Sequence, residues 1–515
     1  MSRRATKPGR RWFGLSCALL LLTACTPRHE DPNTAVVLID SSPTNLDLRI
    51  GTDAQSERIG SLIFDPLVRK DEHFQMQPWL ATAWSQPDPL TWIFRIRTGV
   101  RFHNGQPLTA QDAAYTVNSL IDGTLITSKA GAFEAVSKAE APTPEILILH
   151  LKRPDASLLF NLSDGLFGVV PKNSGKELGR NPVGSGPFRF VSATVDKDVV
   201  VARNPEYWAG PAHLERVRFP VVPDAVTVAL EMQKGSADIA SNDLTLDMVY
   251  ALRNAKGLIT ESAPSSTVMY LNFNVADGPL RDKRVRQAIA CAIDREAIIR
   301  ALWRNQAHLA EMLLPPGHWA AASQLPRYPH DIARATRLLD AAGFSPDKQG
   351  VRLRLEMKTS TDETTRLLAV ILQQQLRPAG IELTLRSAEF GTFYADVTRG
   401  AFQMYALKWV GSNEDPDIFR YAYSSDRFPP KGGNRGHYMN ARVDELLRQA
   451  AATTDEPTRR RAYVEVQQIL ADELPSIPLW YPNNEIVHTS RITHVTPRGS
   501  GSFDFLREAE IHPYR

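Results

Sequence analysis

The second half of this 515-residue chain alternates strand and helix patterns in an order that few folds allow. Residues 351–357, 381–387 and 402–409 are short stretches with the apolar or alternating patterns of β-strands. Two amphipathic stretches with helical periodicity separate them, residues 362–380 and 390–400, and each ends in glycine. This strand–helix–strand–helix–strand order predicts a parallel sheet with right-handed crossover connections.

The first half is richer in strands and has fewer helices. Residues 90–97 ("LTWIFRIR") and 145–152 ("EILILHLK") have strand composition. Between them, residues 108–121 form a helical pattern that begins with Thr109 as N-cap and Asp112 three residues later, a variant of the capping box. Near the end, residues 475–489 form an extended, proline-containing stretch. At roughly 150 residues per domain the chain is too long for one core, so we expect two α/β lobes.

The N-terminus has the features of a lipoprotein signal peptide. Five cations and no acid precede an apolar stretch, residues 12–24, which is shorter than the roughly 20 residues of a membrane-spanning helix. Residues 1–24 therefore match a secretory signal peptide. The Leu-Thr-Ala-Cys sequence at residues 22–25 resembles the lipobox of bacterial lipoproteins, which implies cleavage before Cys25 and lipidation of that residue. A plain signal peptide is the alternative, and both Sec and twin-arginine export remain open.

Removal of residues 1–24 lowers the formal net charge from +3 to −2, so the apparent basicity belongs to the targeting segment. The mature chain therefore gives no basis for nucleic-acid binding. Residues 25–34 form a polar, lipidated tether, and two or more acyl chains give a stable membrane anchor. Cys291 is then the one free thiol; it flanks an apolar helical stripe, and we expect it to be buried and inert.

Common catalytic and cofactor motifs are missing from the sequence. It contains no His-Glu-x-x-His zinc motif, no Gly-x-Ser-x-Gly elbow and no complete dinucleotide or phosphate loop. We therefore predict no catalytic residue, no metal and no cofactor, and a protein that is not an enzyme. A catalytic cluster assembled only by folding would escape this search.

Six stretches together resemble one family. In chain order they are "PWLATAWSQPDPLTWIFRIRTGVRFHNGQPLTAQDAAYTV", "NPVGSGPFRFV", "ARNPEYWAGPAHLERVRF", "MQKGSADIA", "LNFNVADGPLRDKRVRQAIACAIDREAII" and "ATRLLDAAGF". Each is weak alone, but in this order and spacing they are similar to the extracellular solute-binding proteins of the oligopeptide/dipeptide/nickel class (bacterial solute-binding protein family 5), which serve ABC importers. The stretches are spread over nearly the whole mature chain.

The resemblance implies an α/β, two-lobed periplasmic-binding-protein fold with mixed sheets, a hinge and an extra subdomain on the first lobe. It also implies a ligand enclosed between the lobes, where ligand sites are common and hinge closure is the usual motion. We expect the protein to be a monomer. The expected division is a signal peptide at 1–24, a tether at 25–34, lobe 1 with its subdomain at 35–268, lobe 2 at 269–486, and a return to lobe 1 at 487–515.

In the first lobe, the resemblance places Thr52, Asp53 and Ala54 in a loop against the ligand backbone. The alternative is a surface turn that precedes a helix starting at about Ser56.

In the second lobe, the resemblance implies that an extended ligand pairs with the main chain after Trp409, at Val410 and Gly411, as an added strand. In peptide-binding members, an aspartate shortly after this tryptophan holds the ammonium group of the peptide. The aligned residue here is Ser412, a departure that puts binding of a free peptide N-terminus in doubt. A one-residue shift would bring in one of the residues that follow it, Asn413, Glu414 or Asp415.

The acids after this loop also have a structural explanation. Asp415 followed by Pro416 predicts a helix start, with aspartate as N-cap and proline at the first helical position. Asp417 would then lie in the first turn, where the helix dipole favours negative charge. Whether Asp415 and Asp417 contact ligand or only start a helix stays open.

A glycine-rich loop farther along, residues 429–440, offers further ligand contacts at Asn434, Arg435 and Tyr438. The guanidinium of Arg435 has the planar fork that suits a ligand carboxylate. A solvent-exposed loop is the alternative.

We predict a lipoprotein on the periplasmic side of the cell envelope that captures short peptides and delivers them to the permease subunits of an ABC importer. Because of Ser412, a non-peptide solute such as a metal chelate, an opine or an oligosaccharide is the first alternative. A cell-envelope hydrolase or sensor on the same scaffold is the second. Anchoring in the inner or the outer membrane stays open, although Thr26 lacks the aspartate linked to inner-membrane retention.

Overall fold

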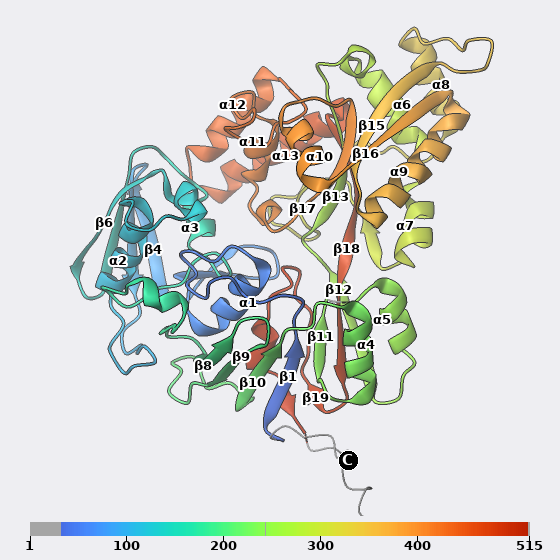
Figure 1. The fold of residues 1–515 in the computed structure, drawn as a ribbon. Coiled ribbons are helices and arrows are strands. Elements are labelled where there is room, and N and C mark those ends of the chain that lie inside the picture. Colours follow the sequence, from blue (N-terminus) through green and yellow to red (C-terminus); the bar gives the residue numbers. More distant parts are fainter. Residues whose placement is uncertain (1–31, 243, 513–515) are drawn as a thin grey trace, which may run out of the picture.

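The computed structural model describes residues 32–242 and 244–512, which form two lobes (Figure 1). The predicted signal peptide, Cys25 and the tether up to residue 31 lie outside these residues. Two buried clusters that span residues 268–481 form the cores of the upper lobe in Figure 1. Within the described residues, no helix combines the length and the apolar character that crossing a membrane requires.

The alternation that the sequence predicts is confirmed in the upper lobe, lobe 2. Strand β15 pairs in parallel with both β16 and β17, and the helices α9 and α10 connect the three strands. Helix α9 ends in a short 3-10 turn that Gly380 closes in the left-handed conformation (φ 81°), as glycine readily does. The bounds are β15 Leu353–Ser360, α9 Glu363–Leu376, β16 Ile381–Ala388, α10 Phe390–Thr398 and β17 Met404–Trp409.

One long strand, β18 (Ser476–Thr489), takes part in the sheets of both lobes. Its first residues pair with β13 (Val268–Phe273) of lobe 2, and its last residues pair with β11 (Ile239–Ser241) and β12 (Leu258–Pro264) of the lower lobe, lobe 1. The segment between β12 and β13 is a second crossing between the lobes (Figure 1). These two crossings are where a hinge motion must be accommodated.

The sheet of lobe 1 is mixed. Its central strand β1 (Thr34–Leu38) runs parallel to β10 (Arg216–Pro220) and β11, and two antiparallel strands, β9 (Asp198–Arg203) and β8 (Phe188–Thr194), complete the far edge. The Gly-Pro-rich stretch before β8 passes close to the end of helix α1 (Ala54–Ile63). A Cβ at Gly184 would lie 1.9 Å from the Ile63 carbonyl oxygen, so only glycine fits there.

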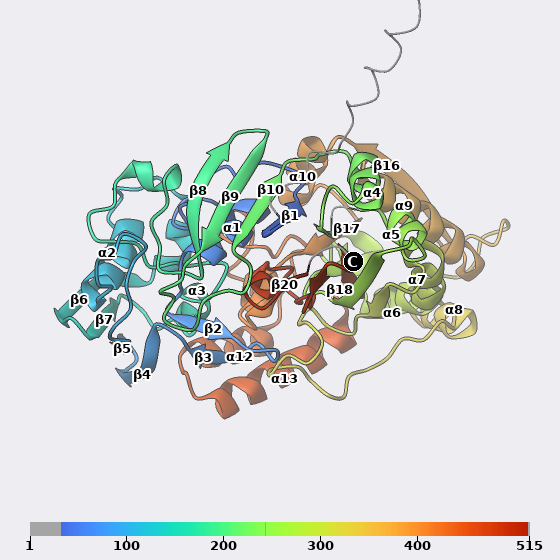
Figure 2. The ribbon, with the colours of Figure 1, turned by 90° about the horizontal axis from the view of Figure 1, so that it is seen from below.

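An extra subdomain of lobe 1 has its own four-stranded antiparallel sheet and its own buried cluster. The predicted capping box opens its helix α2, with the Thr109 amide donating to the Asp112 carboxylate (2.8 Å). In Figure 2 this subdomain lies at one end of the molecule, and α7, α8 and α9 lie at the other. Its elements are β4 Ala81–Asp88, β5 Thr91–Ile96, α2 Ala110–Ile121, β6 Val136–Thr143 and β7 Ile146–Leu151.

Each of the five buried hydrophobic clusters lies in one lobe, apart from single residues at the boundaries in β13 and β18, so the lobes have separate cores. Cys291 is fully buried, and burial raises the pKa of its thiol, as expected for an inert residue. The other elements are β2 Val68–Lys70, β3 Met76–Pro78, α3 Leu158–Asn161, α4 Ala225–Lys234, α5 Leu246–Leu252, α6 Lys283–Ala292, α7 Arg295–Trp303, β14 Ala307–Leu309, α8 Ile332–Ala341, α11 Ile418–Tyr423, α12 Ala441–Ala451, α13 Glu456–Glu473, β19 Ile492–Thr493 and β20 Glu510–Ile511.

Candidate functional site

An aromatic stack lies at the end of β17. The Trp409 ring is 9% exposed and stacks on Tyr270 of β13, with ring centroids 5.6 Å apart and an interplanar angle of 11°. Tyr421 meets Trp409 edge-on at 5.9 Å, and its side chain is 44% exposed. Trp409, at the end of β17, is therefore part of a partly exposed aromatic surface. Such rigid rings offer a ligand a large contact area at little conformational cost.

Arg435 lies on this aromatic surface. Its guanidinium carbon is 5.3 Å from the ring centroids of both Trp409 and Tyr394, and it donates to the Tyr270 hydroxyl (3.3 Å) and the Tyr394 hydroxyl (2.9 Å). Burial alone would lower the pKa of Arg435, but the surrounding tyrosine oxygens raise it above its usual value, so the group stays charged. Within the described part of the chain, no carboxylate forms an ion pair with it. A buried cation without an anionic partner is suited to a ligand carboxylate.

The loop after Trp409 divides into an exposed part and a buried part. Val410 is 69% exposed, and Gly411 adopts a positive φ of 72° just before a short 3-10 turn, Ser412–Glu414. Asn413 is fully buried, and its amide donates to the carbonyls of Ser266 (2.5 Å) and Leu313 (2.8 Å). Val410 is thus accessible to a ligand, whereas the Gly411 carbonyl accepts from the Glu414 amide (2.9 Å) and Asn413 holds the loop in place. The side chain of Ser412 lies outside the described atoms.

Glu414 links the two lobes. Its carboxylate accepts hydrogen bonds from the ammonium of Lys70 on β2 (2.7 Å) and from the hydroxyl of Ser266 between β12 and β13 (2.6 Å). Its carbonyl accepts from Nε2 of His318 (3.1 Å), whose ring stacks on Phe74 of lobe 1. Burial alone would lower the pKa of Lys70, but the Glu414 carboxylate outweighs it and the pKa rises well above its usual value. The carboxylate of Glu414 is therefore already bonded to groups of the protein, Lys70 and Ser266.

The predicted helix start at Asp415 is wrong by two residues. Helix α11 begins at Ile418, and Asp417 occupies the N-cap position without a side-chain cap bond. A turn precedes the helix, because the Ile418 amide bonds to the Asp415 carbonyl (3.0 Å) and the Asp415 carboxylate accepts from the Asp417 amide (3.0 Å). Burial raises the pKa of Asp417 to about 7, and the negative charge of Asp415 adds to the rise.

The predicted first-lobe residues lie at the start of α1. The helix starts at Ala54 rather than at about Ser56, because Asp53 is its N-cap and accepts from the Ser56 amide (2.9 Å). Burial alone would raise the pKa of Asp53; its hydrogen bonds with Ser56 and Thr44 lower the pKa overall. Thr52 and Ala54 are exposed. Their role toward a ligand stays a prediction, since no described hydrogen bond or ion pair joins them to the lobe 2 loop.

Asn434 and Tyr438 bond within lobe 2. Asn434 is buried and donates to the carbonyls of Ser424 (3.0 Å) and Tyr438 (2.8 Å). The Tyr438 hydroxyl donates to Glu473 (2.5 Å). These bonds fix the glycine-rich loop, and the structure brings Arg435 together with Trp409, which the exposed Val410 follows in the chain.

Sequence reasoning missed the tyrosines around Arg435 and the cation opposite Glu414. Tyr270 lies in an apolar strand and Tyr394 in an amphipathic helix, so neither stands out from a core residue in the sequence. Lys70 lies on a three-residue strand in the other lobe, more than 340 positions from Glu414. Only the fold brings these groups together.

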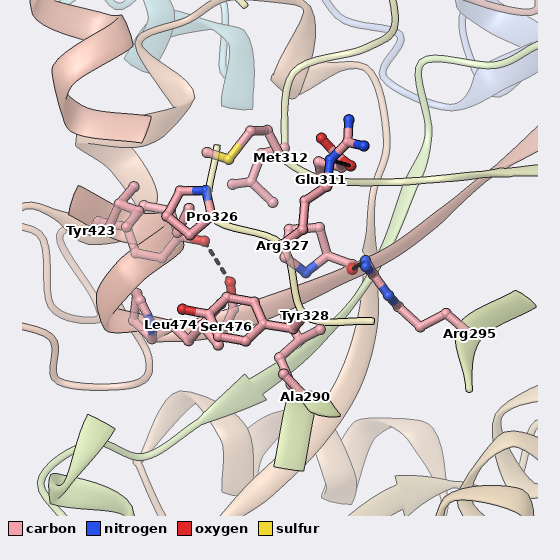
Figure 3. A pocket seen from close by; sticks show the side chains of 16 residues that line it. Ala290, Arg295, Glu311, Met312, Pro326, Arg327, Tyr328, Tyr423, Leu474 and Ser476 are labelled. Carbon is pink, nitrogen blue, oxygen red and sulfur yellow. Dashed lines mark hydrogen bonds and ion pairs between the residues drawn. The ribbon is translucent and has the colours of Figure 1, made fainter. Parts of the chain in front are cut away.

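A pocket inside lobe 2 is not the solute site (Figure 3). The hydroxyls of Tyr423 and Ser476 meet in it (2.6 Å), and its walls are mostly apolar. Its volume is about 40 Å³. A cavity that holds one benzene molecule measures roughly 150 Å³, so this pocket is too small for a dipeptide.

Comparisons with known proteins identify the family. The model of the bacterial extracellular solute-binding proteins, family 5 (middle region) matches residues 75–429. A probable di/tripeptide-binding protein of Pseudomonas aeruginosa is 28% identical over 462 residues, covering 84% of this chain and 86% of that protein. The glutathione-binding protein GsiB of Escherichia coli is 25% identical over 505 residues and covers 96% of both chains.

Solved structures share the fold. HbpA2 of Haemophilus parasuis has a TM-score of 0.83 at 22% identity and covers 93% of this chain and 99% of its own. NikA of Brucella suis in complex with Fe(III)-EDTA has a TM-score of 0.83 at 24% identity, with the same coverage. DppA of Helicobacter pylori in complex with the peptide STSA has a TM-score of 0.73 at 23% identity and covers 93% and 98%. The two-lobed fold is thus confirmed, and the chain belongs to the bacterial extracellular solute-binding proteins of family 5.

Proposed function

We propose that this protein captures short peptides between its lobes and delivers them to an ABC importer. The observation that carries the proposal is Arg435, a buried cation without a carboxylate partner in the described structure, on the ring of Trp409 and close in sequence to the exposed Val410. The names of the relatives support the ligand class, since they are di/tripeptide-binding, oligopeptide-binding and glutathione-binding proteins. Because its relatives are binding proteins, we propose no catalytic step.

In this proposal a peptide lies extended along the end of β17. Its main chain pairs with Val410 and Gly411, a contact that does not depend on side-chain sequence. Its terminal carboxylate binds the guanidinium of Arg435, and its apolar groups cover Trp409 and Tyr421. Hinge closure along β18 then brings lobe 1 over the bound peptide.

Isothermal titration calorimetry with Ala-Ala-Ala and its C-terminal amide tests this assignment. The free acid should bind more tightly than the amide, and Arg435→Met should weaken free-acid binding about 10- to 100-fold, the value of a charge-assisted hydrogen bond. Arg366→Met, which changes an exposed arginine of α9, is the matched control and should bind as the wild type does. Equal affinity for acid and amide, or no effect of Arg435→Met, would overturn the peptide assignment.

A carboxylate-bearing non-peptide solute is the second candidate. The structures with Fe(III)-EDTA and with Ni(L-His) support it, because the fold accommodates chelates in those proteins. Arg435 would serve such a ligand equally well. A thermal-shift panel of peptides, metal chelates, opines and oligosaccharides separates the two, since the true class alone should raise the melting temperature.

We also propose an exported protein with a lipid anchor at Cys25 and a tether up to residue 34. The family is extracellular, and the lipobox-like sequence before Cys25 supports acylation. The proposed division keeps lobe 1 at 35–268, lobe 2 at 269–486 and the return to lobe 1 at 487–515; its boundaries fall at the start of β13 and within β18, the strand that both lobes share. Intact mass spectrometry of the mature protein tests the anchor, since an unmodified N-terminus at residue 25 would refute it.

A further inference from the structure

A second cavity, of about 250 Å³, lies between the lobes. The subdomain side provides Trp84 and Phe160, and lobe 2 provides Trp319 and Arg459. Two hydrogen bonds between the lobes involve lining residues: Gln75 donates to Glu456 (3.2 Å), and Thr454 donates to Gln86, which lies outside the lining (2.9 Å). Figure 2 shows β2 and β3 close to α13, in agreement with these contacts. The volume has room for roughly eight water molecules, or for one amino-acid side chain.

Arg459, on the first turn of α13, is a buried cation with few partners. Its side chain is 12% exposed, and its Nε is buried without a hydrogen-bond partner. Its terminal nitrogens make one long bond to the Tyr463 hydroxyl (3.4 Å) and lie 4.0 Å from the Asp415 carboxylate. The guanidinium lies over the rings of Trp319 and Tyr463, 5.4 and 5.6 Å from their centroids. An arginine with unused donors beside an open cavity favours an incoming acceptor.

Among the described side chains, no carboxylate makes a close hydrogen bond to Arg459, although the charges of Asp415 and Asp417 act on it. Glu414 is neutralised by Lys70 at 2.7 Å, and Glu456 accepts from the amide of Gln75. Asp415 is the one described carboxylate paired with Arg459, and a distance of 4.0 Å is the long limit of an ion pair. A ligand carboxylate that reaches hydrogen-bond distance would therefore make the closer contact.

We infer that this cavity takes the side chain of the first residue of a bound peptide and that Arg459 selects an acidic one. The inference rests on the proposed function, because it places the ligand along Val410 and Gly411. The cavity residues Glu414 and Asp415 follow Gly411 by three and four positions, and the inference therefore places the near end of the ligand at the cavity. The aromatic walls cover the methylene groups of a glutamate, and the fork of Arg459 binds its carboxylate.

Calorimetry with Glu-Ala-Ala, Gln-Ala-Ala and Ala-Ala-Ala tests the inference. The wild type should bind the Glu peptide about tenfold or more tightly than the Gln peptide, the usual value of one charge-assisted pair. Arg459→Gln should reduce this preference to about twofold or less and change Ala-Ala-Ala binding by less than about threefold. Arg460→Gln, which removes an exposed charge at the adjacent position, should keep the preference.

Met76→Trp provides a second test that leaves Arg459 in place. Met76 is half-buried and lines the cavity, so an indole there should fill the space and remove the preference for Glu-Ala-Ala over Ala-Ala-Ala. The inference is overturned if the wild type shows no Glu preference, or if the preference survives both Arg459→Gln and Met76→Trp. Failure of all three peptides to bind would instead refute the proposed function, and the inference with it.

Discussion

The ion pair between Lys70 and Glu414 gives the sharpest prediction on stability. The two side chains are 9% and 3% exposed and come from different lobes, 2.7 Å apart. At an effective dielectric constant of about 20, that separation corresponds to an attraction of about 6 kcal/mol. Desolvation offsets much of this attraction, but removal of one partner leaves the other charge buried. Lys70→Met or Glu414→Gln should therefore lower the free energy of unfolding by about 3–5 kcal/mol.

The double variant Lys70→Met/Glu414→Leu removes both charges and should recover most of that loss, because apolar replacement of a buried pair is often neutral. Urea denaturation followed by tryptophan fluorescence and circular dichroism measures each free energy. Lys283→Met is the matched control, because its pair with Asp472 is 48% and 49% exposed and should contribute less than about 1 kcal/mol. Small-angle X-ray scattering should also show more open lobes in the single variants.

Two results would refute this reasoning. One is a single-variant loss no larger than that of Lys283→Met, which would mean that water or lobe opening screens the pair. The other is a double variant that loses the sum of the two single losses, which would mean that the charges do not interact.

Two further predictions concern carboxylates at helix starts. Asp417 has a pKa raised to about 7 in the folded protein, against 3.8 for an unperturbed side chain, so its contribution to stability is full below about pH 4 and is lost as the pH rises toward 7. Asp417→Asn should therefore be more stable than the wild type at pH 8, and the difference in urea midpoint should disappear by pH 4; a constant difference would contradict this. At the start of α1, Asp53→Ala should cost about 1 kcal/mol in urea denaturation whereas Asp53→Ser should cost less, because serine still caps the helix. Equal losses would argue against the cap.

The sequence predicts most elements of the fold because the hydrophobic periodicity is strong where the elements are long. The parallel unit of β15, β16 and β17, the helices α9 and α10, and the extended strand β18 all lie where the patterns place them. The predicted start of α11 was wrong because Asp-Pro is compatible with both a helix start and a turn. The hydrogen bonds of the turn show that the chain forms the turn there. Local chemistry alone does not distinguish these two outcomes.

The candidate site was less predictable. The sequence pointed to Trp409 and Arg435 but not to their contact, which depends on a loop held by the bonds of Asn434 and Tyr438. The contacts between the lobes could not be predicted from the sequence, because Lys70 and Glu414 are far apart in the chain and neither belongs to a recognisable motif. Positions within one element follow from periodicity, whereas contacts between lobes follow from packing that no short stretch encodes.

The path of β18 has a consequence for how the chain matures. Both sheets need this strand, since β13 pairs with its first residues and β11 with its last. A chain that grows or crosses a membrane from its N-terminus therefore lacks the joining strand until residue 489 has emerged, near the end of 515 residues. Contacts this distant in sequence form slowly. The order of strands thus delays stable folding of both lobes until almost the whole polypeptide is available.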